Sequence, residues 1–414
     1  MKHVIIGNGP AGLVAAEHLR RLQPEAEIAL IGDEPEPPYS RMAIPYFLTG
    51  KISAAGTHQR KCHDHYVRER IHLIEGKVVK LDATARQVEF ASGERLPYDR
   101  LLIATGSVPS RENIEGIDLP GVHTCWTLAD ARAIVAEVRP GARIVQMGAG
   151  FVGCIIIEGL MSRGAQLTIL VRSGRMVSRM MPPKASEMIA RWCESHGVHV
   201  MGKTQAARIE RDGGALKVTL TTGETLPADI YLSVVGVKPG IDFLSGSGVA
   251  IETGIVVNEH MQTNVPDVYA AGDVTESRDC LYGRRQINAI QPNAVEQARI
   301  AAINMAGGDT EFLGSLAINV LDTMGLISCS FGQWQGEEGG EGVELVDVAN
   351  HRYLSLQFGG HRLIGATTIG FTDHIGALRG LIQGRVELGA WRERLLADPS
   401  LFMSAYLATT EHLA

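Results

Sequence analysis

The stretch that decides the fold is residues 3–22, which read HVIIGNGPAGLVAAEHLRRL. A short apolar run ends in a glycine-rich turn at residues 7–12, and apolar residues then recur at helical spacing. We expect a strand over residues 3–6, a helix over residues 11–22 and a second strand over residues 27–31. This order of elements predicts the beginning of a parallel sheet.

A second unit of the same kind begins at residue 143. Residues 143–147 have the pattern of a buried strand, residues 148–153 read GAGFVG, and a helix is expected from there to about Arg163. Another strand is expected over residues 167–171. This approximate internal repeat predicts two separate nucleotide-binding units in one chain.

Both turns follow the pattern G-x-G-x-x-G. Such a turn lets the backbone bend sharply, lets a pyrophosphate approach without a Cβ in the way, and aims helix N-terminal N–H groups at negative charge. One copy alone is a weak signal, and the alternative is a flexible glycine loop, but here each copy stands between a strand and a helix. The residues that we assign to these two turns are Gly7, Gly9, Pro10, Ala11 and Gly12 in the first unit and Gly148, Gly150, Phe151, Val152 and Gly153 in the second.

The charged residues beyond the two turns differ. Asp33 and Glu34 lie about 20 residues past the first turn, where an acidic residue commonly accepts hydrogen bonds from an adenosine ribose. The alternative is that they cap a loop and contact only water. The corresponding place in the second unit carries Arg172 and Arg175, and a guanidinium pairs well with a 2′-phosphate. We therefore favour NADPH at the second turn, the alternative being two solvated surface arginines.

Two further strands mark where the chain passes between domains. Residues 101–106 and 230–236 each read as a buried strand that ends in a glycine turn. The second unit is therefore expected to be inserted in the first. The predicted domains are residues 1–110 with 238–310, residues 111–237, and residues 311–414.

A third element, residues 263–273, ends in another glycine after a predicted strand over residues 268–271. Gly272 permits close backbone approach, and Asp273 is placed to accept hydrogen bonds from a polyol. We take Asp273 as a candidate ribitol ligand.

The C-terminal part has a different texture. Residues 353–358 and 362–369 flank Gly359-Gly360, which predicts a hairpin, and residues 335–342 form a loop rich in Gly and Glu. A helix is expected where apolar residues recur at Ile375, Leu378 and Ile382. The predicted fold class is α/β, with two Rossmann-like dinucleotide-binding domains, one inserted in the other, plus a small α+β C-terminal domain.

The bulk properties limit the function classes. A length of 414 residues predicts two or three domains, and a formal charge of −7 argues against nucleic acid as the main partner, with a local basic patch left open. The longest apolar stretch, around residues 151–157, is far shorter than the roughly 20 residues of a membrane-spanning helix. We interpret the start of the sequence as a buried strand and expect no export signal. Six scattered cysteines without a C-x-x-C favour a reducing, cytoplasmic location over a disulfide framework or a cysteine-ligated cluster.

Together these motifs resemble the pyridine nucleotide-disulfide oxidoreductase superfamily over about residues 1–310. The matching pieces are residues 7–12, Ala104-Thr105-Gly106, residues 148–153 and residues 269–273, in that order. Within it, Pro38-Tyr39-Ser40-Arg41 and Ile44-Pro45-Tyr46 resemble the branch that holds rubredoxin and ferredoxin reductases, nitrite reductase flavoproteins, NADH oxidases and coenzyme A disulfide reductases. Residues 311–414 resemble the interface domain of that group only loosely, so a homodimer is left open.

The resemblance implies FAD in the first domain and NADPH or NADH in the inserted one. Hydride transfer from nicotinamide C4 to flavin N5 needs stacking and dry surroundings, so no catalytic side chain is expected. Beyond the turns and the charged residues named above, the residues that the resemblance places at the bound cofactors are Arg41, Pro45, Val79, Ala104, Thr105, Gly106, Gly236, Gly272, Asp273, Pro292 and Asn293.

The chain also departs from the pattern of this group. Met42 stands where the disulfide reductases and water-forming oxidases carry a redox cysteine, and a thioether cannot form a thiolate. Cys62, His63 and His65 are close in sequence and raise a metal site as an alternative, but we favour a surface cluster, and we expect no metal.

A lysine and a glutamate beside the flavin are common in the ferredoxin-reductase branch. Here the matching positions hold Tyr46 and Ile155. The loss of both is coherent, since either charge left alone in a buried pocket is costly. Glu158 lies about one helical turn beyond Ile155 and is a possible substitute, the alternative being an exposed helix residue.

These observations favour a reductase that passes electrons from NAD(P)H through FAD to an external one-electron carrier, such as an iron-sulfur protein or rubredoxin. A second hypothesis is an NAD(P)H oxidase, or a quinone or small-molecule reductase without a redox cysteine. A third is a flavin-binding assembly or regulatory subunit that docks through residues 311–414.

Overall fold

The computed structural model describes residues 1–62 and 64–410. The chain divides into two compact units. The first consists of Met1–Met42, Ala54–Val108 and Val237–Leu316, and the second of Ala43–Ser53, Pro109–Gly236 and the residues from 317 onward. Each unit is described by itself.

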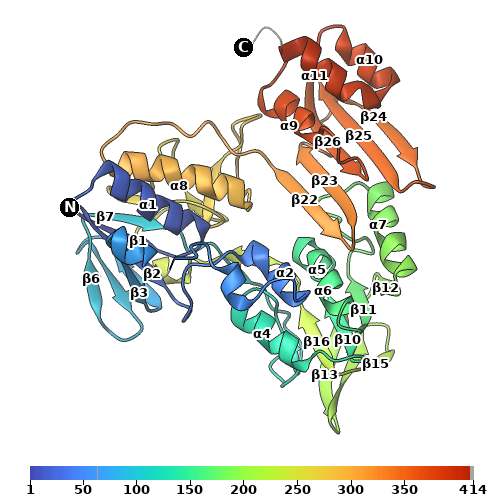
Figure 1. Cartoon of the computed structure of the whole chain (residues 1–414), viewed down its shortest axis with the longest axis horizontal. Helices are drawn as coiled ribbons and strands as arrows, with labels where there is room; N and C mark the ends of the chain where they lie inside the picture. Colours follow the sequence, from blue (N-terminus) through green and yellow to red (C-terminus); the bar gives the residue numbers. More distant parts are fainter. Residues whose placement is uncertain (63, 411–414) are drawn as a thin grey trace. The chain divides into compact units, whose positions relative to one another are not determined.

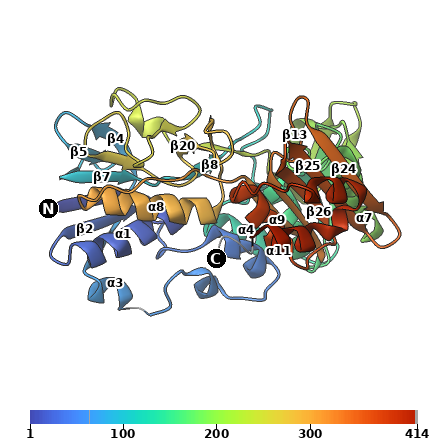
Figure 2. The same cartoon turned by 90° about the horizontal axis from the view of Figure 1, so that it is seen from above.

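The first unit is built on a five-stranded parallel sheet. The strands in spatial order are β19 (Val268–Ala270), β7 (Arg100–Ile103), β1 (Lys2–Ile6), β2 (Glu27–Gly32) and β3 (Ile71–Glu75). In the register, Val4 pairs with Ala29 on one side and with Leu101 on the other. Helices α1 (Pro10–Leu22) and α8 (Gln291–Met305) lie side by side on one face, as Figures 1 and 2 show. The predicted strand, turn and helix at the N-terminus are confirmed.

The second unit repeats this arrangement. Its parallel sheet has the order β12 (His199–Gly202), β11 (Gln166–Val171), β10 (Arg143–Met147), β16 (Ile230–Ser233) and β9 (Val122–His123). The helices of this part are α4 (Leu128–Glu137), α5 (Phe151–Ile155), α6 (Ile157–Met161) and α7 (Pro183–Ser195). The single helix predicted to about Arg163 is wrong, because a turn at Ile156 divides it into α5 and α6.

Each parallel sheet is accompanied by a three-stranded antiparallel meander. The first meander is β4 (Val78–Asp82), β5 (Gln87–Phe90) and β6 (Arg95–Pro97), and the second is β13 (Ala206–Asp212), β14 (Ala215–Leu220) and β15 (Thr225–Ala228). In the second unit, meander residues such as Val218 share a core with Tyr231 of β16 and Met147 of β10. The parallel sheets are therefore covered on both faces, which explains their nearly continuous apolar sequences.

The C-terminal part forms a third sheet within the second unit. Its five antiparallel strands run in the order β22 (Ile318–Thr323), β23 (Leu326–Gly332), β26 (Arg362–Ile369), β25 (Arg352–Gly359) and β24 (Glu341–Asp347). Three helices follow in α9 (Ile375–Gln383), α10 (Trp391–Ala397) and α11 (Phe402–Thr410). The predicted hairpin and the predicted α+β composition are confirmed. Glu341 and Gly342, expected in a loop, instead begin β24 and pair with Phe358 and Gln357.

The remaining elements are short. They are α2 (Ile44–Leu48), α3 (His65–Arg68), β8 (Ser107–Pro109), β17 (Val237–Pro239), β18 (Ile255–Val256), β20 (Thr275–Arg278) and β21 (Arg285–Gln286). Strands β8 and β17 pair with each other where the chain passes between the units.

The strands that lead to these crossings are shorter than predicted. Strand β7 ends at Ile103 rather than residue 106, and β16 ends at Ser233 rather than residue 236. In each case the chain turns away where it meets the glycine turn of the neighbouring strand, Gly7 beside Ala104 and Gly148 beside Val234.

The unit boundaries fall within a few residues of the predicted crossings. Two features were not expected. Residues 43–53 leave the first unit for the second, and the C-terminal sheet groups with the second parallel sheet rather than apart from it. The division into three domains stays a prediction.

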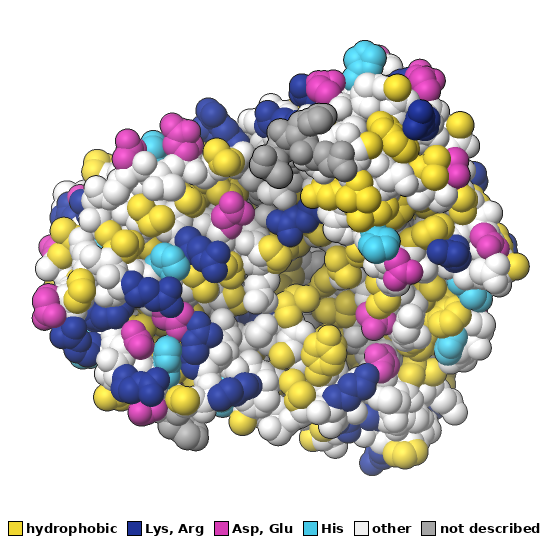
Figure 3. Space-filling model, turned by 45° about the horizontal axis from the view of Figure 1, so that its top comes forward, with side chains coloured by type: hydrophobic (Ala, Val, Ile, Leu, Met, Phe, Trp, Pro, Cys, Tyr) yellow, Lys and Arg dark blue, Asp and Glu magenta, His cyan; other side chains and the backbone are white. Residues whose placement is uncertain are grey.

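Two surface properties complete the fold. Among the described residues, no helix is both long and apolar enough to cross a membrane. On the face shown in Figure 3, basic and acidic side chains are interspersed.

Candidate functional site

The first glycine turn is shaped by close backbone contacts. A Cβ at Gly7, whose φ is +106°, would lie 2.1 Å from the carbonyl oxygen of Ala104. A Cβ at Gly12 would lie 1.8 Å from the carbonyl oxygen of Gly7. Both contacts let α1 pack tightly against the sheet, and neither position accepts a side chain.

The N-terminus of α1 is built to receive an anion. Gly9 is its N-cap in an extended conformation, Pro10 is in the first turn, and no side chain caps the helix. A Cβ at Gly9 would meet nothing within 4 Å. The free N–H groups of the first turn and the helix dipole therefore favour a bound phosphate here.

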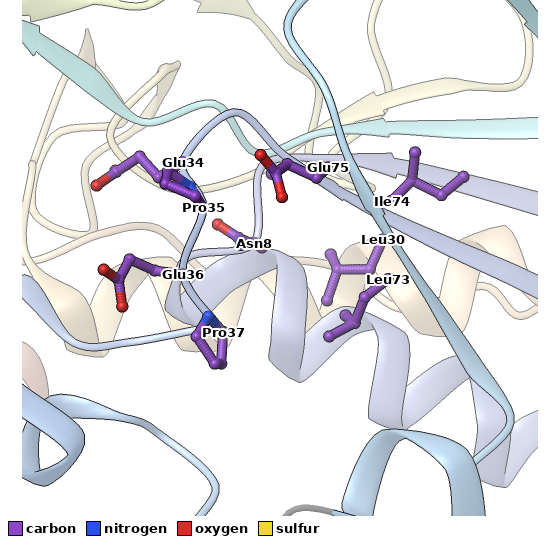
Figure 4. A pocket seen from close by; sticks show the side chains of 10 residues that line it. Asn8, Leu30, Glu34, Pro35, Glu36, Pro37, Leu73, Ile74 and Glu75 are labelled. Atoms are coloured by element: carbon purple, nitrogen blue, oxygen red, sulfur yellow. The ribbon is translucent and has the colours of Figure 1, made fainter.

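A pocket lies at the carboxyl ends of β1, β2 and β3. Figure 4 shows its polar side chains, which are Asn8, Glu34, Glu36 and Glu75. Leu30, Leu73 and Ile74 supply apolar lining from β2 and β3. A pocket beside a phosphate-binding turn, with apolar lining and several acceptors, fits an adenosine.

The two acidic residues predicted for the ribose are placed differently. Glu34 lines the pocket and already accepts hydrogen bonds from the Tyr39 hydroxyl at 2.7 Å and from Arg41 Nη2 at 2.8 Å. Asp33 is exposed. Arg41 is thus held by Glu34 beside the pocket, and the assignment of Asp33 and Glu34 to a ribose stays a prediction.

Asp273 lies beside α1, and its assignment to a polyol stays a prediction. It follows Gly272, whose Cβ would lie 3.3 Å from Ala11 Cβ, so it stands next to the first helix. Burial raises the pKa of Asp273, and the charge of Arg41 opposes this rise. Within the described residues no hydrogen bond to the Asp273 carboxylate is formed. It is therefore available to accept one from a ligand.

The other first-unit candidates occupy varied places. The Thr105 hydroxyl donates to the Gly240 carbonyl at 2.8 Å, next to Ala104 and Gly106 at the end of β7. Pro292 is exposed in the first turn of α8. The Asn293 amide donates to the carbonyls of Asn288 and Leu316, so its nitrogen holds backbone. Val79 is 42% exposed on β4 and lies outside the pocket lining described above.

These residues fit FAD. The uncapped helix start would hold the pyrophosphate, the pocket at Asn8 and Glu75 the adenosine, and Asp273 the ribitol. When bound, the cofactor supplies the redox chemistry, accepting a hydride from a dihydronicotinamide, while the chain binds it, orients it and excludes water.

The second glycine turn repeats the geometry of the first. A Cβ at Gly148 would lie 2.4 Å from the Val234 carbonyl oxygen, and one at Gly153 would lie 2.5 Å from the Gly148 carbonyl oxygen. Gly150 is the extended N-cap of α5, and Phe151 and Val152 are half-buried in its first turn. Gly236 is exposed, with a φ of +119° and open space around it.

Arg172 and Arg175 lie just beyond β11 and are both exposed. Neither guanidinium forms an ion pair or hydrogen bond with any residue that the structure describes. They are therefore available to an anionic ligand, which is compatible with the predicted 2′-phosphate contact.

Comparison with known proteins decides the family. Residues 1–301 match the family described as pyridine nucleotide-disulphide oxidoreductase. The chain belongs to this family.

Two relatives and one solved structure illustrate the similarity. The NADH-dependent phenylglyoxylate dehydrogenase subunit epsilon of Aromatoleum evansii is 32% identical over 402 residues, 96% of this chain and 95% of the relative. The biphenyl dioxygenase system ferredoxin–NAD(+) reductase component of Paraburkholderia xenovorans is 33% identical over 306 residues, 73% of this chain and 74% of the relative. The covalent putidaredoxin reductase–putidaredoxin complex contains a similar chain, with a TM-score of 0.91, 26% identity and 99% of both chains covered.

The predicted fold class, cofactors and enzyme class are confirmed by these findings. This pyridine nucleotide-disulphide oxidoreductase is an FAD-dependent enzyme that uses NADH or NADPH, of the ferredoxin reductase-like branch. Two dinucleotide cradles of matching geometry are what such an enzyme requires.

Met42 stands at the position that the sequence resemblance assigns to the redox cysteine of the disulfide reductases. Met42 is 48% exposed in the short helical turn that begins at Arg41. Five cysteines are buried and only Cys62 is exposed. Burial raises the pKa of Cys125 and of Cys193 to about 12, so these thiols stay protonated. No thiolate relay is available from them.

The sequence neighbours of Cys62 belong to a structural cluster. His65 Nε2 and Glu17 Oε1 are 2.9 Å apart, and Arg60 donates to both carboxylate oxygens of Glu17. His63 lies outside the described residues. Among the others, no group of three metal-ligating side chains comes together.

The two positions at which the branch carries a charged pair are uncharged here. Tyr46 is 55% exposed and Ile155 is half-buried, and neither bears a charge. Glu158 forms an ion pair with Lys51 at 2.8 Å, a partner that sequence reasoning missed. Lys51 follows α2 and Glu158 lies in α6, so each charged residue comes a few positions after the residue compared with the branch, Tyr46 or Ile155. A search for charges in the residues that follow these two positions could have found the pair.

Glu112 is a second residue that sequence reasoning missed. Its carboxylate accepts hydrogen bonds from the Tyr231 hydroxyl and from Ser233 Oγ, each at 2.7 Å. Burial raises the pKa of Glu112, while these hydrogen bonds and the charge of Arg172 act in the opposite direction. Glu112 follows the first crossing, and its hydrogen bonds fix that part of the chain to β16. A lone glutamate in a loop gives no sequence signal for such a contact.

Proposed function

We propose that this enzyme passes electrons from NAD(P)H through FAD to an external one-electron carrier, an iron-sulfur protein, rubredoxin or a similar protein. The observation that carries the proposal is Met42, a thioether where a cysteine relay would need a thiol. Without such a relay, electrons leave the bound cofactor directly for a partner outside the chain. A flavin can release them singly, which suits a one-electron carrier.

The names of the relatives support this choice of partner. One is a ferredoxin reductase component and another was solved with putidaredoxin attached. A cytoplasmic location is part of the proposal, supported by cysteines that form no disulfide.

An anaerobic titration tests the proposal. The FAD-loaded protein is titrated with NADPH and with NADH, and bleaching of the flavin bands reports reduction. Ferredoxin, rubredoxin or cytochrome c is then added, and reoxidation of the flavin is followed by stopped flow. The proposal requires that one carrier reoxidises the flavin much faster than dissolved oxygen or a quinone does. Fast NAD(P)H consumption in air without a carrier would instead indicate an oxidase.

NADPH is the coenzyme that the second cradle favours in this proposal. Two exposed arginines, Arg172 and Arg175, follow β11, and their guanidinium groups would pair well with a 2′-phosphate. The phenylglyoxylate dehydrogenase relative carries NADH in its name, so NADH is the competing outcome.

A second candidate function is that of an electron-transfer subunit in a larger complex. One observation favours it: the match to a dehydrogenase subunit runs over 402 residues, whereas that to the ferredoxin reductase component runs over 306. The longer match includes most of the C-terminal sheet. Size-exclusion chromatography of tagged protein from its native cells tests this. A stoichiometric complex of several chains would support the subunit, and a free monomer or homodimer would support the independent reductase.

A further inference from the structure

Gln146 is a polar residue inside β10, two positions before the second glycine turn. Its side chain is fully buried, at 0% exposed, and its neighbours Val145 and Met147 are buried and apolar. An amide group in such a strand is costly unless it forms hydrogen bonds. The contacts of Gln146 therefore indicate what the amide does there.

The Gln146 amide joins the two ends of the second glycine turn. Nε2 donates to the carbonyl of Gly148 at 2.9 Å and to that of Gly153 at 3.0 Å. Because both acceptors are carbonyl oxygens, only the nitrogen of the amide can face them. Oε1 is buried and meets no hydrogen-bond donor among residues 1–62 and 64–410. The first and the last glycine of the motif are thus held by one side chain.

Ile5 holds the equivalent place in the first unit, two positions before its glycine turn. A Cβ at Gly12, the last glycine of that turn, would lie 3.2 Å from Ile5 Cγ2, and a Cβ at Gly153 would lie 3.1 Å from Gln146 Nε2. A methyl group in one unit and an amide in the other therefore occupy the same position. The first turn forms without hydrogen bonds from this position. Since Gln146 also leaves a buried oxygen unpaired, which is unfavourable, stability does not explain the amide.

The helix after the second turn differs as well. Helix α1 runs unbroken for 13 residues, whereas α5 has 5 residues and is separated from α6 by a turn at Ile156. In a continuous helix the Gly153 carbonyl would accept from the N–H of Ile157. Gln146 adds a second donor to this carbonyl, and a side chain that inserts into the hydrogen-bond ladder bends a helix. Gln146 therefore acts on the turn and on the start of the helix that follows.

We propose that Gln146 is a positioning residue for NAD(P)H, which holds the second glycine turn in the form that receives the coenzyme's pyrophosphate. The backbone of such a turn approaches the pyrophosphate closely, so a small shift of the turn weakens those contacts. A turn that is fixed at both ends before binding also loses less freedom on binding. All the contacts that carry this inference lie within the second unit. The inference rests on the place proposed for NAD(P)H at the second turn and does not depend on the electron acceptor.

The main test is Gln146→Met, which keeps the length of the side chain and removes its donor. The Kd of ADP-ribose is measured by isothermal titration calorimetry, and the Kd values of NADPH and NADH come from flavin reduction in stopped flow. We expect all three Kd values to rise about tenfold, with the limiting rate of flavin reduction within about twofold of the parent. The loss should be shared because the three ligands carry the same pyrophosphate.

Two further variants separate this effect from a loss of stability. Gln146→Ile copies the first unit, and it should weaken ADP-ribose binding about as much without lowering the free energy of unfolding, because no amide oxygen is left unpaired. Ile382→Val removes a methyl group from a fully buried residue of α9. It should lower the free energy of unfolding and leave the Kd of ADP-ribose within about twofold.

Three results would overturn the role of Gln146. They are unchanged ADP-ribose binding in both Gln146 variants, a slower limiting rate at unchanged Kd, and a loss of affinity that follows the loss of stability in all three variants. A parent protein that binds no ADP-ribose overturns it too. The binding assay contains no electron carrier, so failure of the proposed acceptor would be seen separately and would leave this inference standing.

Discussion

At the scale of single residues, the absence of one Cβ shapes each cradle. Gly7 combines a φ of +106° with a Cβ position only 2.1 Å from the Ala104 carbonyl oxygen. Gly93, in the same unit, has a φ of +87° and open space. A comparison of substitutions at the two positions therefore separates the effect of backbone strain from that of steric overlap.

We predict that Gly7→Ala abolishes FAD retention and lowers the free energy of unfolding by about 3 kcal/mol or more, because strain and overlap add. Gly93→Ala should cost only the strain, about 1–2 kcal/mol, and keep FAD. The flavin-to-protein absorbance ratio and urea unfolding report the two effects. Equal FAD content in both variants would contradict the role of Gly7.

Coenzyme choice is also decided by single residues. We predict that Arg172→Ala weakens NADPH binding about tenfold and leaves NADH binding within about twofold, because only NADPH carries the 2′-phosphate. The measurement is coenzyme Kd from flavin reduction in stopped flow. Arg139→Ala is the matched control, since Arg139 is exposed just before the amino end of β10, whereas Arg172 follows the carboxyl end of the parallel strand β11. A loss shared equally by both coenzymes would refute the phosphate contact.

At the scale of elements, a buried carboxylate ties α1 to the segment that leads into α3. Glu17 is 7% exposed and is bound by Arg60 and His65. Burial acts to raise the pKa of Glu17, but the hydrogen bonds and charges of Arg60 and His65 outweigh it, so the pKa is lowered from 4.5. The contact thus favours the ionised carboxylate in the folded protein.

The lowered pKa of Glu17 makes the stability of the protein depend on pH. The stabilisation by Glu17 is fully present above its unfolded pKa of 4.5 and is lost as the pH falls through the lower folded pKa. We predict that Glu17→Gln lowers the free energy of unfolding by about 2 kcal/mol at pH 7 and by much less at pH 3.5. Urea unfolding of the variant and the parent at several pH values checks this. Glu94→Gln, at an exposed residue of the same unit, should change stability at neither pH.

At the scale of the whole molecule, we assign separate ligands to the two units. We assign the FAD contacts to the unit that holds α1, β3 and Asp273. A ligand stabilises only the folded state that binds it, so FAD is expected to stabilise this unit. We predict that removal of FAD accelerates hydrogen exchange throughout β1, β2, β3 and α1, and leaves β10, β11 and β14 within about twofold. Re-addition of FAD at about 100 times its Kd should restore about 2.7 kcal/mol of stability to the first unit. Equal acceleration in both units would mean that they unfold as one.

Much of this architecture was predictable, because its signals are local. The pattern G-x-G-x-x-G between a strand and a helix specifies a backbone bend, and at Gly7 and Gly148 the structure shows the carbonyl contacts that exclude a Cβ. The hairpin at Gly359-Gly360 and the helix at Ile375 follow from turn chemistry and periodicity in the same way. The sequence also placed Asp273 beside the first cradle, because a strand end and a glycine fix its position.

What the sequence by itself determined is therefore the pair of parallel α/β units, the cradles and the missing thiol at Met42. Only the tertiary structure decided the rest. The pairing of Lys51 with Glu158 and the packing of Leu48 on Gly159 join residues more than 100 positions apart. Such contacts depend on how packed elements meet in space, and neither propensity nor spacing along the chain encodes that meeting.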